Sequence, residues 1–154
     1  MVNLQVRPIQ NQQELEEMYY QRWLVLRAPL GMVQGTEQDK YDSSAFHVVA
    51  VCDQRTIVGS ARLRELSPEI GSIAYVCVLP EFRHQGIGTK LIQKLIEKAQ
   101  AKQLKSIRLK SRMTALDFYQ RLGFSTNGEP FDFLNIPHIF MSLNLLPSSE
   151  KSGD

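Results

Sequence analysis

Apolar and polar residues alternate in several short stretches of this chain, as they do in β-strands that bury one face. The alternation predicts strands at 4–9, 46–52, 56–66, 69–79, 106–112, 124–127 and 138–145, with a hairpin turn at 53–55. Apolar residues three or four positions apart predict helices at 14–27, from 89 onward and at 115–122. The polar stretch 34–44 is either a loop or a short second helix.

The order of these elements predicts the α/β class. Helices that alternate with strands favour a mixed sheet with helices on both faces, and disfavour a sandwich of two sheets. The 154 residues are the size of one ordinary domain, and no internal repeat or linker is evident. We therefore expect a single domain over 1–146, followed by a polar, flexible tail over 147–154.

Composition narrows the class of protein. The chain is 43% hydrophobic and 22% charged, which is typical of a soluble globular protein, and its net charge of +2 is too small to indicate nucleic-acid binding. No apolar run approaches the length of a membrane span, and the first residues lack a signal-peptide core, so we expect a cytoplasmic protein without a membrane partner. Cys52 and Cys77 lie in apolar runs and are expected to be buried free thiols. No metal is expected.

The segment Arg83-His84-Gln85-Gly86-Ile87-Gly88-Thr89 lies between a predicted strand and a predicted helix. Glycine lets the backbone approach a ligand closely, and the first N–H groups of a helix have no intrahelical acceptor, so the segment suits a pyrophosphate. Its glycine spacing does not fit a P-loop, and Leu91 stands where a dinucleotide fingerprint has its third glycine. A tight turn without a ligand is the alternative.

Two motifs together resemble the GNAT N-acetyltransferases. Arg83-x-x-Gly86-x-Gly88 resembles that family's acetyl-CoA loop, and the segment 115–124, which reads A-L-D-F-Y-Q-R-L-G-F, resembles its A-x-x-F-Y-x-x-x-G-F segment. The stretch 128–141 is similar to the tail of small uncharacterised members related to the ElaA group. The resemblance implies the GNAT fold, a central mixed and largely antiparallel sheet of about seven strands with helices on both faces. It also implies transfer of an acetyl group from acetyl-CoA to a primary amine, by direct attack in a ternary complex.

The resemblance assigns the donor site residue by residue. The acetyl and pantetheine parts are expected to accept hydrogen bonds from the backbone of Val76 and Val78. The pyrophosphate contacts transfer to the glycine loop, namely to Arg83, Gln85, Gly86, Gly88 and Thr89, with backbone contributions from His84 and Ile87.

The resemblance also makes Tyr119 the candidate general acid, since a phenol with an ordinary pKa near ~10 is protonated at neutral pH and suited to protonate a thiolate. Packing of Phe118 and Tyr119 against the sheet is the alternative. Many relatives carry a glutamate on the strand before the glycine loop, but residues 72–78 contain no carboxylate. Glu65, Glu129 and His138 are therefore the candidates for the general base.

The acceptor is not identified by the sequence. Arg22 and Arg27 on the first predicted helix are candidates to attract an anionic group, although solvated helix arginines are the simpler interpretation. Asp39 and Asp42 are candidates to bind an amine, with an ordinary loop surface as the alternative. The expected partner is a small-molecule or peptide amine, and a homodimer is possible because dimers are frequent among similar proteins. A non-catalytic acyl-CoA-binding sensor or interaction module is the second functional hypothesis.

Overall fold

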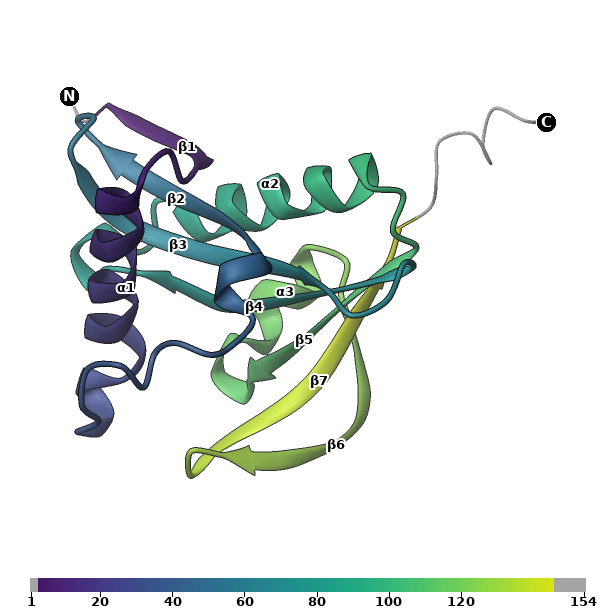
Figure 1. The fold of residues 1–154 in the computed structure, drawn as a ribbon. Helices are drawn as coiled ribbons and strands as arrows, with labels where there is room; N and C mark the ends of the chain where they lie inside the picture. The colour runs from purple at the N-terminus through teal and green to yellow at the C-terminus, as the bar shows by residue number, and fades with distance from the viewer. Residues whose placement is uncertain (1–2, 146–154) are drawn as a thin grey trace. The chain divides into compact units, whose positions relative to one another are not determined.

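The computed structural model describes residues 3–145, and the tail expected at 147–154 lies outside that range. The elements, drawn in Figure 1, are β1 (Leu4–Pro8), α1 (Gln12–Leu26), β2 (Phe46–Cys52), β3 (Thr56–Glu65), β4 (Ile70–Val78), α2 (Ile87–Ala101), β5 (Ser106–Arg112), α3 (Leu116–Arg121), β6 (Ser125–Phe133) and β7 (Ile136–Asn144). The strands form one seven-stranded sheet in the order β1-β2-β3-β4-β5-β7-β6. β4 and β5 pair in parallel, whereas the pairs β1–β2, β2–β3, β5–β7 and β6–β7 are antiparallel. The predicted α/β class with a mixed sheet is confirmed.

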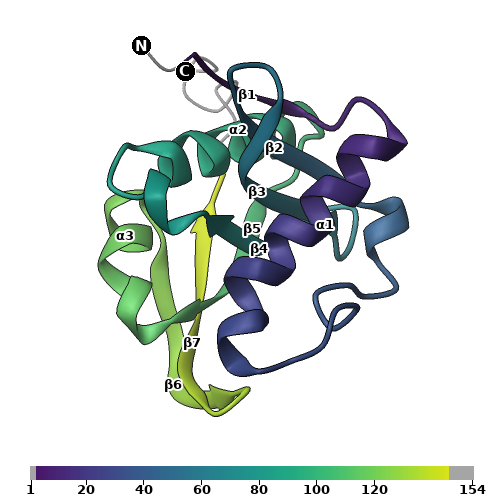
Figure 2. The ribbon, with the colours of Figure 1, turned by 90° about the vertical axis from the view of Figure 1, so that its left-hand side faces the viewer.

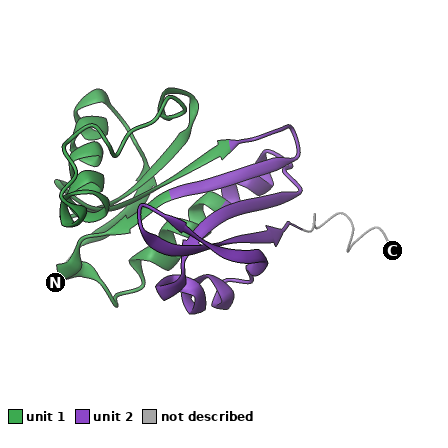
Figure 3. Ribbon diagram, turned by 90° about the horizontal axis from the view of Figure 1, so that it is seen from below, with its two compact units in different colours: residues 1–64, 75–95 green, residues 65–74, 96–154 purple. Residues whose placement is uncertain are grey.

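The chain divides into two compact units, shown in Figure 3. Unit 1 comprises residues 1–64 and 75–95, and unit 2 comprises residues 65–74 and 96–154. Unit 1 contains β1, α1, β2, most of β3 and the glycine loop. Unit 2 contains β5, α3 and the β6–β7 hairpin. The two candidate motifs of the sequence therefore belong to different units.

In unit 1, helices cover both faces of the sheet. Met18 of α1 is fully buried against Val49 of β2, and Figure 2 shows α1 crossing the strands on that side. Ala50, the next residue, points to the opposite face and pairs with Gly59 of β3. A Cβ placed on Gly59 would lie 3.3 Å from the side chain of Leu91 in α2. The absence of a side chain at Gly59 therefore lets α2 pack closely on the face opposite α1.

Local chemistry sets the ends of α1. The side chain of Asn11 accepts a hydrogen bond from the N–H of Glu14 at 2.8 Å, which satisfies one of the free donors at the helix start. Glu14 in turn pairs with Arg7 of β1 at 2.6 Å, and this ion pair links the helix to the first strand. The helix ends at Leu26, and a 3₁₀ turn over Ala28–Leu30 follows.

In unit 2, the last two strands are longer than the predicted 124–127 and 138–145. The segment Gly128-Glu129-Pro130 has the composition of a turn, yet it forms an irregularity inside β6, where the register with β7 shifts between Asn127 and Phe131. Gly128 has φ 76°, which a bulge accommodates, and proline is tolerated at bulges because it needs no ladder hydrogen bond there. The hairpin turn is instead at Leu134 and Asn135, which both have positive φ.

Candidate functional site

The glycine loop ends directly in the first turn of α2. The N–H of Lys90 donates to the carbonyl of Gly86 at 3.1 Å, so α2 starts at Ile87, two residues earlier than predicted. The N–H groups before Lys90 have no helical carbonyl to bind and lie at the positive end of the helix dipole. Gly86 has φ 79°, and a Cβ there would meet nothing within 4 Å. The loop therefore needs glycine for its backbone conformation, and the space beside Gly86 is open.

Arg83 provides a cation at the start of the same loop. Its side chain is exposed, and its Nε donates to the carbonyl of Val78 at 3.2 Å. This bond ties the guanidinium to the end of β4 while its two terminal nitrogens make no hydrogen bond to the part of the chain that the structure describes. An arginine held in this way can bind a phosphate bidentately.

Strand β4 changes conformation at Tyr75, which has φ 57°. A left-handed φ is unusual for a bulky aromatic residue, and it interrupts the regular extended backbone just before Val76. Cys77 is 4% exposed and its Sγ lies 3.4 Å from both Ser60 Oγ and Gln21 Nε2. Burial raises the pKa of the Cys77 thiol, so it stays protonated and belongs to the packing. Cys77 and Cys52 are both buried and free, as predicted.

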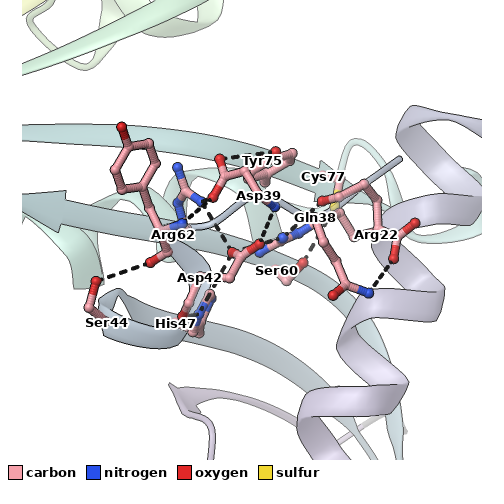
Figure 4. Close-up of polar contacts among 12 residues, drawn as sticks. Arg22, Gln38, Asp39, Asp42, Ser44, His47, Ser60, Arg62, Tyr75 and Cys77 are labelled. Carbon is pink, nitrogen blue, oxygen red and sulfur yellow. Dashed lines mark hydrogen bonds and ion pairs between the residues drawn. The ribbon is translucent and has the colours of Figure 1, made fainter. Parts of the chain in front are cut away.

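A buried cluster of charged side chains lies on the α1 side of unit 1 (Figure 4). Asp42 Oδ1 accepts from Arg22 Nη1 and from Arg62 Nη1, at 3.1 Å each. Arg62 Nη1 also donates to Asp39 Oδ1 at 2.6 Å. Asp42 Oδ2 accepts the backbone N–H of Asp39 at 2.9 Å, so one carboxylate joins helix, loop and strand.

Tyr75 lies in the middle of this cluster. The ζ carbons of Arg22 and Arg62 are 4.0 Å and 4.8 Å from its ring centroid, distances at which a cation is attracted to an aromatic face. Its hydroxyl donates to Asp39 Oδ2 at 3.3 Å. Burial, reinforced by the charge of Asp39, raises the pKa of the Tyr75 phenol, so it remains a neutral donor. The left-handed conformation of Tyr75 is thus held by contacts on several sides.

Burial and nearby charge also set the protonation of this cluster. Burial, the largest single cause, would raise the pKa of Asp39, but the hydrogen bonds from Arg62, Tyr41 and Tyr75 and the charge of Arg62 together outweigh it, and the net shift is downward. His47 Nε2 lies 2.8 Å from the carbonyl of Asp42, which can only accept, so the ring proton is on Nε2 and Nδ1 is unprotonated. Burial lowers the pKa of His47, and the charges of Arg22 and Arg62 add to this. The imidazole is therefore neutral.

The expected acceptor residues of the first helix are not solvated. Arg22 is 0% exposed and Arg27 is 9% exposed, so the interpretation as solvated arginines is wrong for both. Asp42 is 5% exposed and is not an ordinary loop residue, because its carboxylate is the centre of the cluster. Asp39 keeps a side chain that is 33% exposed.

Arg62 and Tyr75 belong to the cluster but were not singled out from the sequence, and His47 was interpreted there only as a strand residue. The feature of the sequence that could have located them is a polar residue inside a predicted strand. His47 and Arg62 occupy paired positions in β2 and β3, and both are more than nine-tenths buried. A charged residue in a buried strand position requires a partner of opposite charge, but that partner comes from the loop after α1, which strand periodicity does not locate.

Unit 2 contains the candidate general acid. Tyr119 in α3 is 8% exposed, and its ring makes edge-on contacts with Phe118 and Phe124, with centroids 4.9 Å and 5.8 Å away. These contacts fix the orientation of the ring. They fit the packing role of Tyr119, and its role as general acid stays a prediction.

The three base candidates also lie in unit 2, in different surroundings. Glu65 is exposed and pairs with Lys102 at 2.8 Å, and Glu129 is exposed on β6. His138 is 6% exposed and lies 2.7 Å, through Nδ1, from the carbonyl of Ile136. Because that carbonyl can only accept, Nδ1 carries a proton in this contact. Nε2 is therefore the ring nitrogen at which His138 could act as a base.

The mixed seven-stranded sheet and the glycine loop between β4 and α2 define the protein as a GNAT-type α/β protein. A model of the acetyltransferase (GNAT) family matches residues 9–124. The chain belongs to this family of acetyltransferases.

Relatives agree with this assignment. A protein of Bacillus subtilis described as a candidate acetyltransferase is 27% identical over 142 residues, which cover 90% of this chain and 95% of the relative. The crystal structure of Escherichia coli ElaA is similar with a TM-score of 0.79 and 21% identity, covering 93% of this chain and 99% of ElaA. A GNAT acetyltransferase of Elizabethkingia anophelis with acetyl-CoA bound has a TM-score of 0.68 and 20% identity, with coverage of 93% and 99%. At these identities the two structures show the shared fold.

No helix within residues 3–145 is long and apolar enough to cross a membrane. In the same range, no group of three or more histidine, cysteine, aspartate or glutamate side chains is placed to hold a metal ion.

Proposed function

We propose that the protein transfers the acetyl group of acetyl-CoA to a primary amine by direct attack in a ternary complex. The glycine loop is the observation that carries this proposal. It combines an open left-handed glycine, the free N–H groups of α2 and an arginine tied to the end of β4. These are the groups that a pyrophosphate requires, and the family to which the chain belongs uses such a loop for acetyl-CoA.

In this proposal, acetyl-CoA occupies the end of β4 and the start of α2. The pyrophosphate accepts hydrogen bonds from the loop residues Arg83, His84, Gln85, Gly86, Ile87, Gly88 and Thr89. The backbone of Val76 and Val78 donates to the acetyl and pantetheine parts, and a donor aimed at the thioester carbonyl stabilises the developing oxyanion. The left-handed conformation of Tyr75 supports this assignment, because it turns the backbone just before Val76.

The reaction requires two proton transfers. The neutral amine attacks the thioester carbon, a C–N bond forms, the C–S bond breaks, and the thiolate of CoA leaves. We assign protonation of the thiolate to the phenol of Tyr119. Of the base candidates, we favour His138, because the Ile136 carbonyl holds its Nδ1 and leaves Nε2 to accept the proton, whereas Glu65 forms an ion pair with Lys102. Glu129, which has no charged partner among residues 3–145, remains the alternative base.

A panel of amines tests the proposal. The purified protein is incubated with acetyl-CoA and each amine in turn, and release of the CoA thiol is followed with a thiol reagent. We expect release that depends on at least one amine, with acetylated amine as the product by mass spectrometry. Tight binding of CoA without transfer to any amine would favour the acyl-CoA-binding module instead. Thermal protection by ATP or NAD, with none from CoA, would contradict the donor assignment.

We also propose a cytoplasmic location. Two buried free cysteines suit a reducing compartment, where thiols are not oxidised to disulfides. Fractionation of cells that produce the protein, with detection by antibody, would test the location.

A further inference from the structure

We infer that the amine acceptor carries an anionic group, with a carboxylate as its simplest form, and that the guanidinium of Arg27 beside Tyr75 binds this group. The inference rests on the proposed function, because it concerns the acceptor of that reaction. It is carried by the contacts and the charge balance around Tyr75 in unit 1.

Arg27 is a fixed cation without an anionic partner. Its Nε donates to the carbonyl of Thr36 at 3.1 Å and its Nη1 to the carbonyl of Leu26 at 3.2 Å. Both acceptors are neutral, and no carboxylate within residues 3–145 forms an ion pair with Arg27. An arginine that binds the last carbonyls of a helix is ordinary capping, but here capping uses only part of the guanidinium.

The third nitrogen of Arg27 is available to a ligand. Nη2 donates no hydrogen bond to any described residue, and it is not among the fully enclosed donors that lack a partner. The residue is 9% exposed, so the small accessible part of the side chain includes this nitrogen. Since the other two nitrogens are held by the backbone, binding an anion at Nη2 costs little side-chain entropy.

Three arginines surround the ring of Tyr75, but carboxylates pair with only two of them. The ζ carbons of three arginines, Arg22, Arg62 and Arg27, lie 4.0 Å, 4.8 Å and 5.8 Å from the ring centroid. The two carboxylates of the cluster, Asp39 and Asp42, are both bound to Arg22 or Arg62. Because Arg27 is largely buried and has no carboxylate partner, it attracts an anion more strongly than a fully exposed arginine would.

Glu37, the third carboxylate of this region, does not pair with Arg27 either. It is 3% exposed, and its carboxylate accepts from the N–H of Gly35 at 2.7 Å and from Gln38 Nε2 at 2.8 Å. Only its backbone carbonyl accepts from Arg22, at 3.1 Å.

Arg22 also keeps hydrogen-bond donors without an acceptor. Its Nε and Nη2 are enclosed and have no hydrogen-bond acceptor in the described part of the chain. These two nitrogens form one edge of the guanidinium, the edge that usually receives a carboxylate. Arg22 is 0% exposed, so we assign the direct contact with the anion to Arg27. Arg22 contributes its positive charge.

The position of the cluster connects this anion subsite to the reaction. Tyr75 directly precedes Val76, whose backbone is proposed to hold the acetyl group, and Arg27 lies 5.8 Å from the Tyr75 ring. An anion bound at Arg27 therefore holds its amine near the strand on which the thioester is proposed to lie. The partly exposed carboxylate of Asp39, which accepts from the Tyr75 hydroxyl, is available to attract the ammonium form before the proton is lost.

Matched acceptors test the inference. Amino acids are compared with their carboxamides, such as glycine with glycinamide and β-alanine with β-alaninamide, which differ in the negative charge. We expect kcat/KM to be at least ~10-fold higher for the carboxylates, as for loss of one charged hydrogen bond. Arg27→Gln should remove this preference, so that the carboxylate and the amide of each pair are acetylated with similar kcat/KM. The matched control Arg55→Gln, in the exposed β2–β3 turn of the same unit, should keep the preference.

Binding gives a second readout that does not depend on turnover. With CoA present, calorimetric titration should show glycine binding at least ~10-fold more tightly than glycinamide, and this difference should disappear in Arg27→Gln. Arg27→Lys, which keeps the charge, should recover part of it if the glutamine variant is unstable. Equal rates and affinities for both members of each pair, or a preference that survives Arg27→Gln, would overturn the inference. A binding preference without transfer to any amine would instead overturn the proposed function and leave the anion subsite in place.

Discussion

At the scale of single residues, Tyr75 shows how a costly backbone conformation is maintained. A non-glycine residue in the left-handed region costs on the order of 1–3 kcal/mol and persists only where the surroundings determine it. Here two guanidinium groups lie against the ring, and Asp39 accepts from the hydroxyl. The strained residue therefore belongs both to the buried charge cluster and to β4, the strand proposed to hold the acetyl group.

The negative charge of Asp42 is the one that matters most to the stability of the cluster. Arg22 would keep a buried positive charge without a carboxylate partner, and Arg62 would keep only Asp39, so we expect Asp42→Asn to lower the free energy of unfolding by about 3 kcal/mol. Urea denaturation followed by circular dichroism measures the change. Asp132→Asn, an exposed position on β6, is the matched control and should change stability little. Equal stability of the two variants would show that the cluster contributes nothing to folding.

His47 should make the protein less stable in mild acid. Its pKa is lowered in the folded protein, mainly by burial, so below the unfolded value of ~6.5 the unfolded chain binds a proton that the folded protein does not. The free energy of unfolding should therefore fall as the pH decreases from ~7 to ~5.5, and it should fall less in His47→Gln. The lowered pKa values of Asp39 and Glu14 act at lower pH, where their stabilisation is lost as these carboxylates become protonated.

Urea unfolding at the two pH values measures this difference. His84→Asn is the control, because His84 is exposed on the glycine loop and asparagine tolerates its left-handed φ of 64°. A His47→Gln variant with the same pH dependence as the unchanged protein would show that His47 is protonated equally in both states.

The role of Tyr119 as general acid can be tested by removing its hydroxyl alone. Tyr119→Phe retains the ring that packs against Phe118 and Phe124, so we expect a normal fold and nearly unchanged affinity for acetyl-CoA. If the phenol protonates the leaving thiolate, kcat should fall by ~100-fold, the usual contribution of a positioned acid. Steady-state kinetics with an active acceptor, together with titration of CoA, separates the two effects. Unchanged turnover would leave only the packing role.

At the scale of elements, the junction of β4 and α2 combines three local features. The first is the end of β4, where Arg83 donates to the carbonyl of Val78, the second is the left-handed Gly86, and the third is the start of α2. The three follow one another in the chain. Because they are consecutive, their relative geometry depends little on the rest of the protein. This explains why the loop could be recognised from the sequence, with an error of only two residues in the helix start.

Gly86 should be required for CoA binding beyond its effect on stability. Gly86→Ala introduces a Cβ at φ 79°, which strains the loop by ~1 kcal/mol and occupies the open space beside it. We expect CoA affinity to fall by at least ~10-fold, as measured by titration. Gly128→Ala is a matched control, because Gly128 has φ 76° with equally open surroundings but lies in β6. It should lose similar stability and keep its affinity; parallel losses of affinity in both variants would mean that strain alone accounts for the effect.

Strand β6 shows where predicting an element from its own residues alone fails. Gly128 and Pro130 are residues that normally end a strand, and the sequence accordingly predicted a strand only to 127. In the structure β6 continues to Phe133, since the long β7 pairs with it on both sides of the irregularity. Pairing with a neighbouring strand outweighed the local preference of these residues.

At the scale of the whole molecule, the charge cluster combines residues that are distant in the sequence. Arg22 comes from α1, Asp42 from the segment before β2, Arg62 from β3 and Tyr75 from β4. Each separately has an ordinary interpretation, as a solvated arginine, a loop acid or a strand residue. Their common burial, and hence the neutral His47 and the unpaired Arg27, follows only when the hairpin register and the path of the loop are known.

The sequence by itself determined the α/β class, most of the elements and the family, because these depend on periodicity and on motifs whose residues are close together in the chain. It also located the glycine loop and the Tyr119 segment. Only the tertiary structure decided that Arg22 and Asp42 are buried, that Arg62 and Tyr75 join them, and that Arg27 keeps a nitrogen without an acceptor. The physical reason is that the free energy of a buried charge depends on partners brought from other elements, and no local pattern records those partners.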